Sequence, residues 1–236
     1  MFPNPIFSEP LPSTSANYVP VLPEDRRKNS AKQSAFFFKP EKIRPNHTLF
    51  LDVGMIDLVK LPGEKTHRKH PGEVAIVDDS GDLILWARVK IAHEDVCNYF
   101  TAISGIEPRS LANATPFFIV KPAIEYLLET AYLVGLNLQS DLNCLGIQVA
   151  DEYKEDLQKT FVDYNNQPYS LRTLSYYCLC KESFQTGAHS AMSDARATKA
   201  LYKMKSEIMG GSHNLELERL PKIPFIGMRG CKCKKR

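Results

Sequence analysis

Residues 72–89 read GEVAIVDDSGDLILWARV, and this stretch decides the fold. Its two halves are rich in β-branched and aromatic residues, which favour strands, and Asp79-Ser-Gly-Asp82 between them is typical of a tight turn. The pattern predicts a β-hairpin. Just before it, residues 47–55 read HTLFLDVGM, a short apolar run bounded by Pro45 and Gly54 that predicts a buried strand.

Helical patterns dominate the second half of the chain. Thr115-Pro116 opens a helix that is expected to run to about Glu129, with Thr115 as its N-cap. A strand ending at Gly135 follows, and Ser140-Asp141 lies in the next turn or helix. Helices are also expected over 169–178 and, most strongly, over 190–208. Strands first, then helices alternating with strands, predict an α/β domain with a mixed sheet.

Length and composition agree with one domain and some additional chain. The 236 residues are 43% hydrophobic, enough to bury a core without disulfides. No run approaches the roughly 18 apolar residues of a membrane span. The beginning, MFPNPIFSEPLPSTS, lacks a basic segment followed by an apolar one, so we do not expect secretion.

Charge and proline content divide the chain into three parts. Residues 1–45 hold eight of the 16 prolines and are expected to form an extended, disordered tail, in which Phe36–Phe38 is a candidate docking motif for this protein's own surface or a partner. Residues 46–210 form the domain. Residues 211–236 are a basic tail, with six Lys or Arg and no acid from 221 onward.

The basic ends suggest where the protein works. Arg26-Arg27-Lys28 and the terminal GCKCKKR resemble nuclear import signals, although solvated tails look the same. A nuclear, nucleolar or cytoplasmic location is therefore expected, with reduced cysteines. The pairs Cys178-x-Cys180 and Cys231-x-Cys233 have the wrong spacing for a common zinc site.

Three acids and one histidine carry the candidate chemistry. Asp52 lies in an apolar strand, Asp141 follows a strand, and Asp194 begins the strongest helix, five residues after His189. Carboxylates from separate segments could converge on Mg²⁺ or Mn²⁺, and a histidine could accept a proton from an attacking water. Each residue alone could equally be a turn former, a helix-terminus charge or a core residue.

The order of these residues resembles that of a known family. Segments 49–58 (LFLDVGMIDL), 101–111 (TAISGIEPRSL), 133–147 (LVGLNLQSDLNCLGI), 170–175 (SLRTLS) and 189–202 (HSAMSDARATKALY) are similar to the DEDDh 3′→5′ exonucleases. The resemblance is to the branch of RNA exonuclease four and the interferon-stimulated 20 kDa exonuclease. It implies an RNase H-like fold with a mixed five-stranded sheet flanked by helices, and hydrolysis of phosphodiester bonds with two Mg²⁺ or Mn²⁺ ions.

The resemblance also implies roles for individual residues. Metal ligands would be Asp52, Asp141 and Asp194, and the general base would be His189. Substrate would lie beside Met55 and the Ser104-Gly105-Ile106 loop. The implied partner is a nucleic acid with a free 3′ end, most simply single-stranded RNA, and the proline-rich tail could bind a protein partner.

Two positions depart from the family's pattern. The first motif of the family is D-x-E, whereas this chain has Asp52-Val53-Gly54, so the fourth carboxylate is missing. Leu136 stands where relatives carry a histidine. Asp57 could replace the lost acid only if the strand is irregular there, because an odd offset points to the opposite face. Two interpretations stay open: an exonuclease weakened by this loss, and an inactive relative that binds nucleic acid or protein.

Overall fold

The computed structural model describes residues 35–44, 46–111, 113–210 and 219–223. Within them a seven-stranded sheet runs in the order β1-β4-β3-β2-β6-β7, with β5 paired to the far end of β2. The strands are β1 Phe36–Phe38, β2 Thr48–Leu58, β3 Lys69–Asp78, β4 Leu83–Arg88, β5 Val96–Asn98, β6 Tyr132–Gly135 and β7 Lys154–Asp156. The helices are α1 Thr101–Ser104, α2 Phe117–Leu128, α3 Leu138–Leu145, α4 Leu171–Cys178 and α5 Ala191–Met209. Short 3-10 turns occur at Pro40–Lys42, His93–Asp95, Pro108–Leu111, Asp151–Tyr153 and Leu157–Lys159.

The mixed sheet confirms the predicted fold class. Strands β1 to β4 pair antiparallel, whereas β6 runs parallel to β2 and β7 runs parallel to β6. The expected count of five strands is wrong. Three of the seven strands are only three residues long, too short to carry a periodic sequence signal, and their pairing depends on distant partners.

The predicted hairpin and the long C-terminal helix are confirmed. Gly81, in the predicted turn, adopts a φ of 89°. The side chain that closes the turn is Asp78, just before the predicted turn, whose Oδ1 accepts hydrogen bonds from the backbone N–H groups of Ser80 and Asp82. The expected N-cap of the first long helix is wrong. Thr115 exchanges backbone hydrogen bonds with Arg88 and Lys90 beyond the end of β4, so α2 begins only after Pro116.

A short part of each proposed tail packs on the domain. Phe36–Phe38 forms β1, which pairs with β4 and places Phe37 opposite Trp86, so the docking motif contacts this protein's own sheet. At the other end Lys222 forms an ion pair with Asp163 (2.8 Å), so residues 219–223 pack on the domain. The two basic clusters, Arg26-Arg27-Lys28 and the terminal GCKCKKR with Cys231-x-Cys233, lie outside the described residues.

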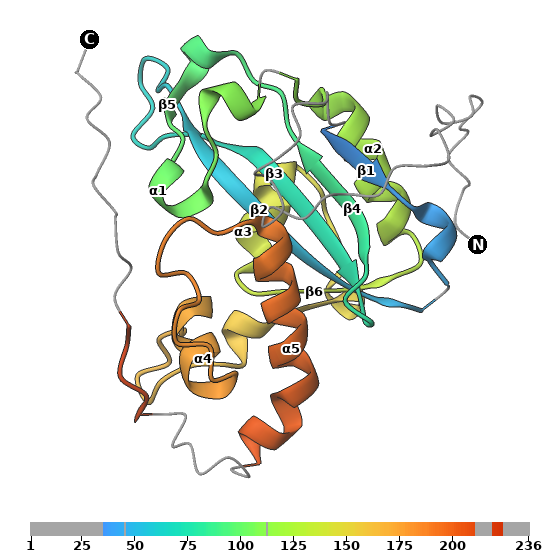
Figure 1. The fold of residues 1–236 in the computed structure, drawn as a ribbon, viewed down its shortest axis with the longest axis vertical. Helices are drawn as coiled ribbons and strands as arrows, with labels where there is room; N and C mark the ends of the chain where they lie inside the picture. Colours follow the sequence, from blue (N-terminus) through green and yellow to red (C-terminus); the bar gives the residue numbers. More distant parts are fainter. Residues whose placement is uncertain (1–34, 45, 112, 211–218, 224–236) are drawn as a thin grey trace, which may run out of the picture. The chain divides into compact units, whose positions relative to one another are not determined.

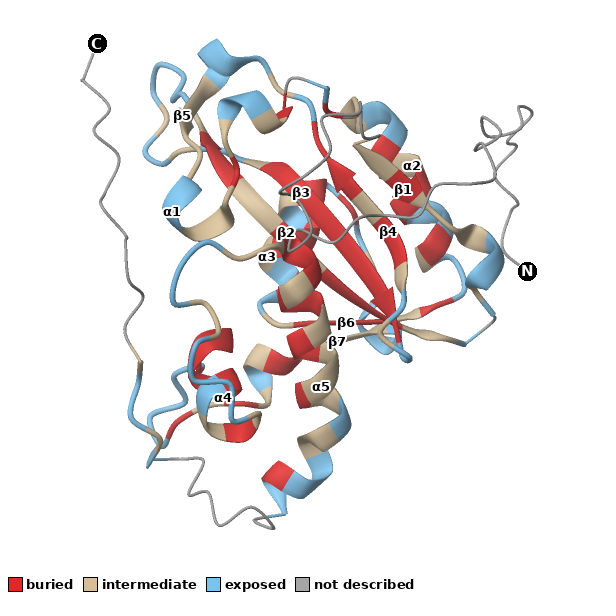
Figure 2. Ribbon diagram, viewed as in Figure 1, coloured by how far each residue is buried: buried red, intermediate tan, exposed pale blue. Residues whose placement is uncertain are grey.

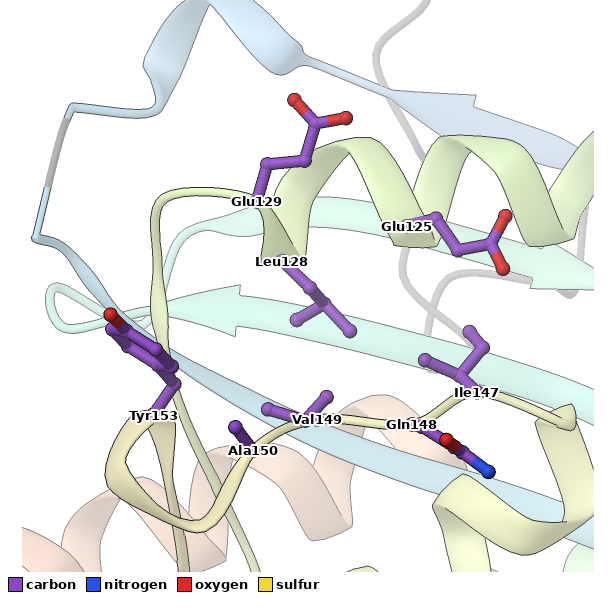
Figure 3. Close-up of a pocket in the computed structure, with 8 residues that line it drawn as sticks. All are labelled: Glu125, Leu128, Glu129, Ile147, Gln148, Val149, Ala150 and Tyr153. Carbon is purple, nitrogen blue, oxygen red and sulfur yellow. The ribbon is translucent and has the colours of Figure 1, made fainter. Parts of the chain in front are cut away.

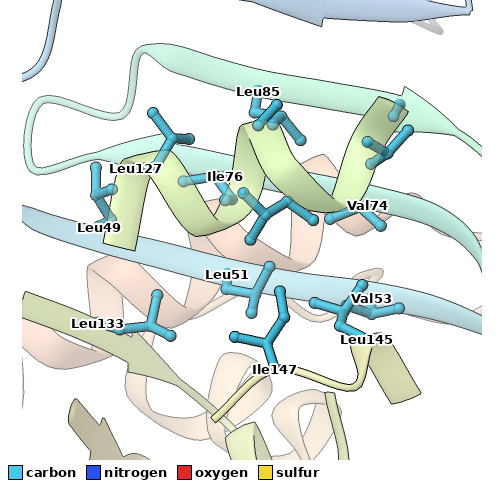
Figure 4. Packing of buried hydrophobic residues seen from close by; sticks show 14 of the residues in the cluster. Leu49, Leu51, Val53, Val74, Ile76, Leu85, Leu127, Leu133, Leu145 and Ile147 are labelled. Atoms are coloured by element: carbon cyan, nitrogen blue, oxygen red, sulfur yellow. The ribbon is translucent and has the colours of Figure 1, made fainter. Parts of the chain in front are cut away.

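Two helices cover opposite faces of the central strands. Helix α2 packs on one face of β2, β3 and β4 through an apolar cluster that includes Leu51, Val53 and Ile76 (Figure 4). Helix α5 lies across the other face and contacts both β2 and β3 (Figure 1). Figure 2 shows that the central strands are buried between these layers. The face under α5 holds the candidate site.

Candidate functional site

Three predicted acids come from different elements and gather at the face covered by α5. Asp52 is half-buried in the middle of β2. Asp141 lies in α3, the helix that follows β6, and is 5% exposed. Asp194 lies in the first turn of α5 and is 4% exposed. We call Asp52, Asp141 and Asp194 the acid cluster.

The carboxyls of the acid cluster are close enough to repel one another electrostatically. Burial raises the pKa of Asp52 well above its ordinary value, and the negative charges of Asp194, Asp141 and Glu73 raise it further. The pKa of Asp141 is also raised well above its ordinary value, first by burial and then by Asp156 and Asp194. Such mutual repulsion is unfavourable for folding, and a cation between the carboxylates would offset it.

The start of α5 is fixed by its own sequence. Ser190 is the N-cap, and its side chain accepts the backbone N–H of Ser193, while the Ser193 hydroxyl reaches back to the backbone of Ser190. This capping box sets the first turn of the helix. Ser193 Oγ also lies 3.2 Å from Asp194 Oδ1, so the local sequence orients the acid.

His189 lies directly against the acid cluster. Its Nδ1 is 2.5 Å from Asp194 Oδ2, and the Gln185 side-chain amide donates to the same oxygen at 2.9 Å. The backbone N–H of His189 donates to the carbonyl of Ile103, which fixes the histidine against helix α1. The structure therefore brings the predicted base together with the predicted third acid. Gln185 is a member of the site that sequence reasoning missed, because it lies in an irregular loop.

The carboxylate oxygens of the acid cluster are the kind of ligand that a hard divalent cation prefers. Asp141 Oδ2 is buried and has no hydrogen-bond partner among the described residues, as expected of an oxygen that is available to bind a cation. Among the same residues, no three Asp, Glu, His or Cys side chains lie close enough together to hold an ion in their present conformations. Side-chain rotation would be required to bring these oxygens around one ion.

The predicted substrate residues fall into two groups. Met55 is half-buried on β2, with its sulfur 4.0 Å from Ser140 Oγ, and Ser104 and Gly105 form the tight turn that ends α1. For these three residues substrate contact stays a prediction. Ile106 does not border an open path, because it is fully buried and packs with Ile56 beside Gly54. It forms part of the core beneath the site.

The cysteines give no zinc site among the described residues. Cys178 is buried and Cys180 is exposed, and both are free thiols. Burial raises the pKa of the Cys178 thiol to about 11, so it stays protonated at neutral pH.

A separate pocket lies between the end of α2 and the segment after α3 (Figure 3). It is lined by Glu125, Leu128, Glu129, Ile147, Gln148, Val149, Ala150 and Tyr153. None of these residues belongs to the acid cluster. No helix among the described residues is both long and apolar enough to cross a membrane.

Comparison with known proteins identifies relatives of the chain. No protein-family model matches it. It is 31% identical over 194 residues to a Gibberella zeae protein named RNA exonuclease 4, covering 78% of this chain and 60% of that protein. A Xenopus laevis protein of the same name is 30% identical over 164 residues, covering 68% of this chain and 37% of the relative. The chain thus spans 60% or less of the length of these relatives.

Solved structures show which fold the chain shares. The Neurospora crassa Pan2 catalytic unit, which contains a protease and a nuclease domain, matches 80% of this chain with a TM-score of 0.64 and 22% identity, over 32% of its own length. A Saccharomyces cerevisiae Pan2 module in complex with AAGGAA RNA matches 79% with a TM-score of 0.67 and 18% identity, over 33% of its length. The predicted RNase H-like fold and the resemblance to the RNA exonuclease four branch are confirmed.

Proposed function

Because the chain is a homologue of the proteins named RNA exonuclease 4, we propose that it is a metal-dependent exonuclease that shortens RNA from the 3′ end. The observation that carries this proposal is the convergence of the acid cluster with His189 at one face of the sheet. The homologues' name and the RNA in the Pan2 complex favour RNA over DNA as the substrate. They give no support to the inactive alternative.

The residues of the site suit phosphodiester hydrolysis. Asp52, Asp141 and Asp194 would hold Mg²⁺ or Mn²⁺, which when bound supplies charge stabilisation and lowers the pKa of water. His189 would accept the proton of the attacking water, because an unprotonated ring nitrogen can act as a general base. Its contact with Asp194 and its backbone hydrogen bond to Ile103 orient the ring toward the acid cluster.

The test is digestion of a 5′-labelled single-stranded RNA with Mg²⁺ or Mn²⁺, beside DNA of the same sequence. We expect a ladder that shortens from the 3′ end, faster on RNA. Asp194→Asn should abolish the ladder, whereas Asp79→Asn, which removes one exposed negative charge in the hairpin turn, should not. An Asp194→Asn variant as active as the wild type would contradict the proposal.

A nuclear location and a protein partner for the proline-rich segment are further parts of the proposal. Their support is the sequence alone, through Arg26-Arg27-Lys28, the terminal GCKCKKR and the prolines of residues 1–33. A fluorescent fusion should lose nuclear enrichment when both basic clusters are replaced by alanine. An unchanged distribution would contradict the assignment of import signals.

A further inference from the structure

One buried acid near the site belongs to none of the predicted motifs. Glu73, on β3, is 2% exposed. It pairs directly with Gly54 in the antiparallel register of β2 and β3, two residues along the strand from the pair of Asp52 with Ala75. Because residues two apart on a strand share a face, Glu73, Gly54 and Asp52 project on the same side of the sheet.

The side chain of Glu73 occupies the region that a side chain at position 54 would enter. A Cβ at Gly54 would lie 3.4 Å from Glu73 Cβ, so side chains at the two positions would start in van der Waals contact. The Glu73 carboxylate reaches from there to the first residue of α5, where its Oε2 accepts the Ala191 N–H at 3.2 Å. Asp194 lies three residues further along the same helix. The carboxylate is therefore held between the strand of Asp52 and the helical turn of Asp194.

The hydrogen bonds of Glu73 orient it without using all of its capacity. Trp86 Nε1 donates to Oε1 at 2.8 Å, and Arg88 Nη2 lies 3.8 Å from the same oxygen. A carboxylate has about four lone-pair positions, so oxygens that each accept one hydrogen bond can still approach a cation. Outer hydrogen bonds of this kind commonly fix ligands of metal sites.

The negative charge of Glu73 is compensated by one cation and adds to the repulsion among the acids of the site. Helix α5 is already capped by Ser190 and Ser193, so the Ala191 N–H does not require a charged acceptor. Burying a carboxylate is costly unless cations compensate it, and Arg88 is the one basic side chain within ion-pair distance of Glu73 among the described residues. Repulsion from Glu73 also adds to that among the acid cluster.

We infer that Glu73 supplies the fourth carboxylate of the site from the neighbouring strand, in place of the acid that Gly54 lacks. This inference rests on the proposed function. A glutamate at either position 54 or position 73 is then enough to supply the fourth carboxylate. Asp57, considered earlier for this role, forms an ion pair with Lys69 Nζ at 2.6 Å instead.

The experiment measures Mn²⁺ binding by calorimetry to the full chain, together with the RNA digestion. Glu73→Gln keeps the size of the side chain but removes its charge and one of its two acceptor oxygens, and it should bind Mn²⁺ about 10- to 100-fold more weakly than the wild type. Glu125→Gln removes an acid from α2 on the opposite face and should bind as the wild type does. The swap variant Gly54→Glu/Glu73→Ala should recover Mn²⁺ affinity and activity relative to Glu73→Gln.

The outcomes separate this inference from the proposed function. If the wild type binds Mn²⁺ and digests RNA while Glu73→Gln matches its affinity, the inference is overturned and the proposed function stands. If the swap variant folds, judged by its thermal melt without metal, yet binds no better than Glu73→Gln, a carboxylate at this place is not what matters and the inference also fails. A wild type that neither binds Mn²⁺ nor digests RNA would overturn both.

Discussion

The two faces of strands β2 and β3 are built from alternate residues of the same segments but have opposite chemistry. Leu51, Val53 and Ile76 pack under α2 in a continuous apolar cluster. One residue away along the same strands, Asp52 and Glu73 are covered by α5 and lie close to two further acids. The α2 face is arranged for stability, whereas the α5 face retains charges that oppose folding. Such a sacrifice of stability is typical of functional sites.

The largest expected effect is the loss of activity on the α5 face. Asp52→Asn removes one charge from the acid cluster with almost no change in shape. We expect the rate of RNA digestion to fall about 100- to 1000-fold, because a group that stabilises the reacting centre is lost. Single-turnover digestion measures this, with Asp79→Asn as the control. A loss of less than threefold would mean that the α5 face is not the reactive one.

A substitution on the α2 face should instead reduce stability. Leu51 is 1% exposed, and Leu51→Ala should lower the free energy of unfolding by about 2–5 kcal/mol through lost burial and a residual cavity. Urea titration measures this, beside Val59→Ala, whose side chain is exposed and should cost little. If Leu51→Ala is as stable as Val59→Ala, the contrast between the faces is not one of packing.

The next prediction concerns stability and pH on the α5 face. Asp141→Asn should stabilise the metal-free protein at pH 7 by about 0.5–2 kcal/mol, because it removes a buried charge. The folded state raises the pKa of Asp141, so it binds this proton more tightly than the unfolded chain does. The wild type therefore loses stability as the pH rises from about the ordinary value of 3.8, and the advantage of the variant should grow over that range.

Thermal melts of both proteins in a chelator, between pH 4 and pH 8, test this sign. An advantage that is constant or shrinks with rising pH would contradict the raised pKa. Added Mn²⁺ should reverse the order, because the cation binds the wild type more tightly and stabilises it by mass action.

The smallest effect is expected where α5 begins. Ser190→Ala removes the N-cap side chain and should cost about 1 kcal/mol of stability. Glu73 still accepts the Ala191 N–H in this variant, so the start of the helix keeps one hydrogen bond to the sheet. Measuring the free energy of unfolding of Ser190→Ala with and without Glu73→Gln tests whether the two contacts depend on each other. Costs that add independently would show that the two contacts do not cooperate.

Local sequence determined much of the fold. The hairpin could be predicted because Asp78 to Asp82 encode their own turn, and α5 because its composition favours a helix and Ser190 caps it. Asp52 and Asp141 stand out as charges in or next to apolar segments, whereas the roles of all four residues, with His189 and Asp194, came from the order of motifs that resembles the DEDDh exonucleases. The turn and capping signals are local, so a single sequence suffices to find them.

The tertiary structure alone decided the partners of those residues. Nothing in the stretch around Glu73 indicates that it lies opposite Gly54, because the register of β2 and β3 joins residues far apart in the chain. For the same reason Phe36–Phe38 became β1 only through its pairing with β4, and Ile106 became core only through its contact with Ile56. Residue type marks which side chains carry charge, and the non-local packing of strands and helices decides which charges meet.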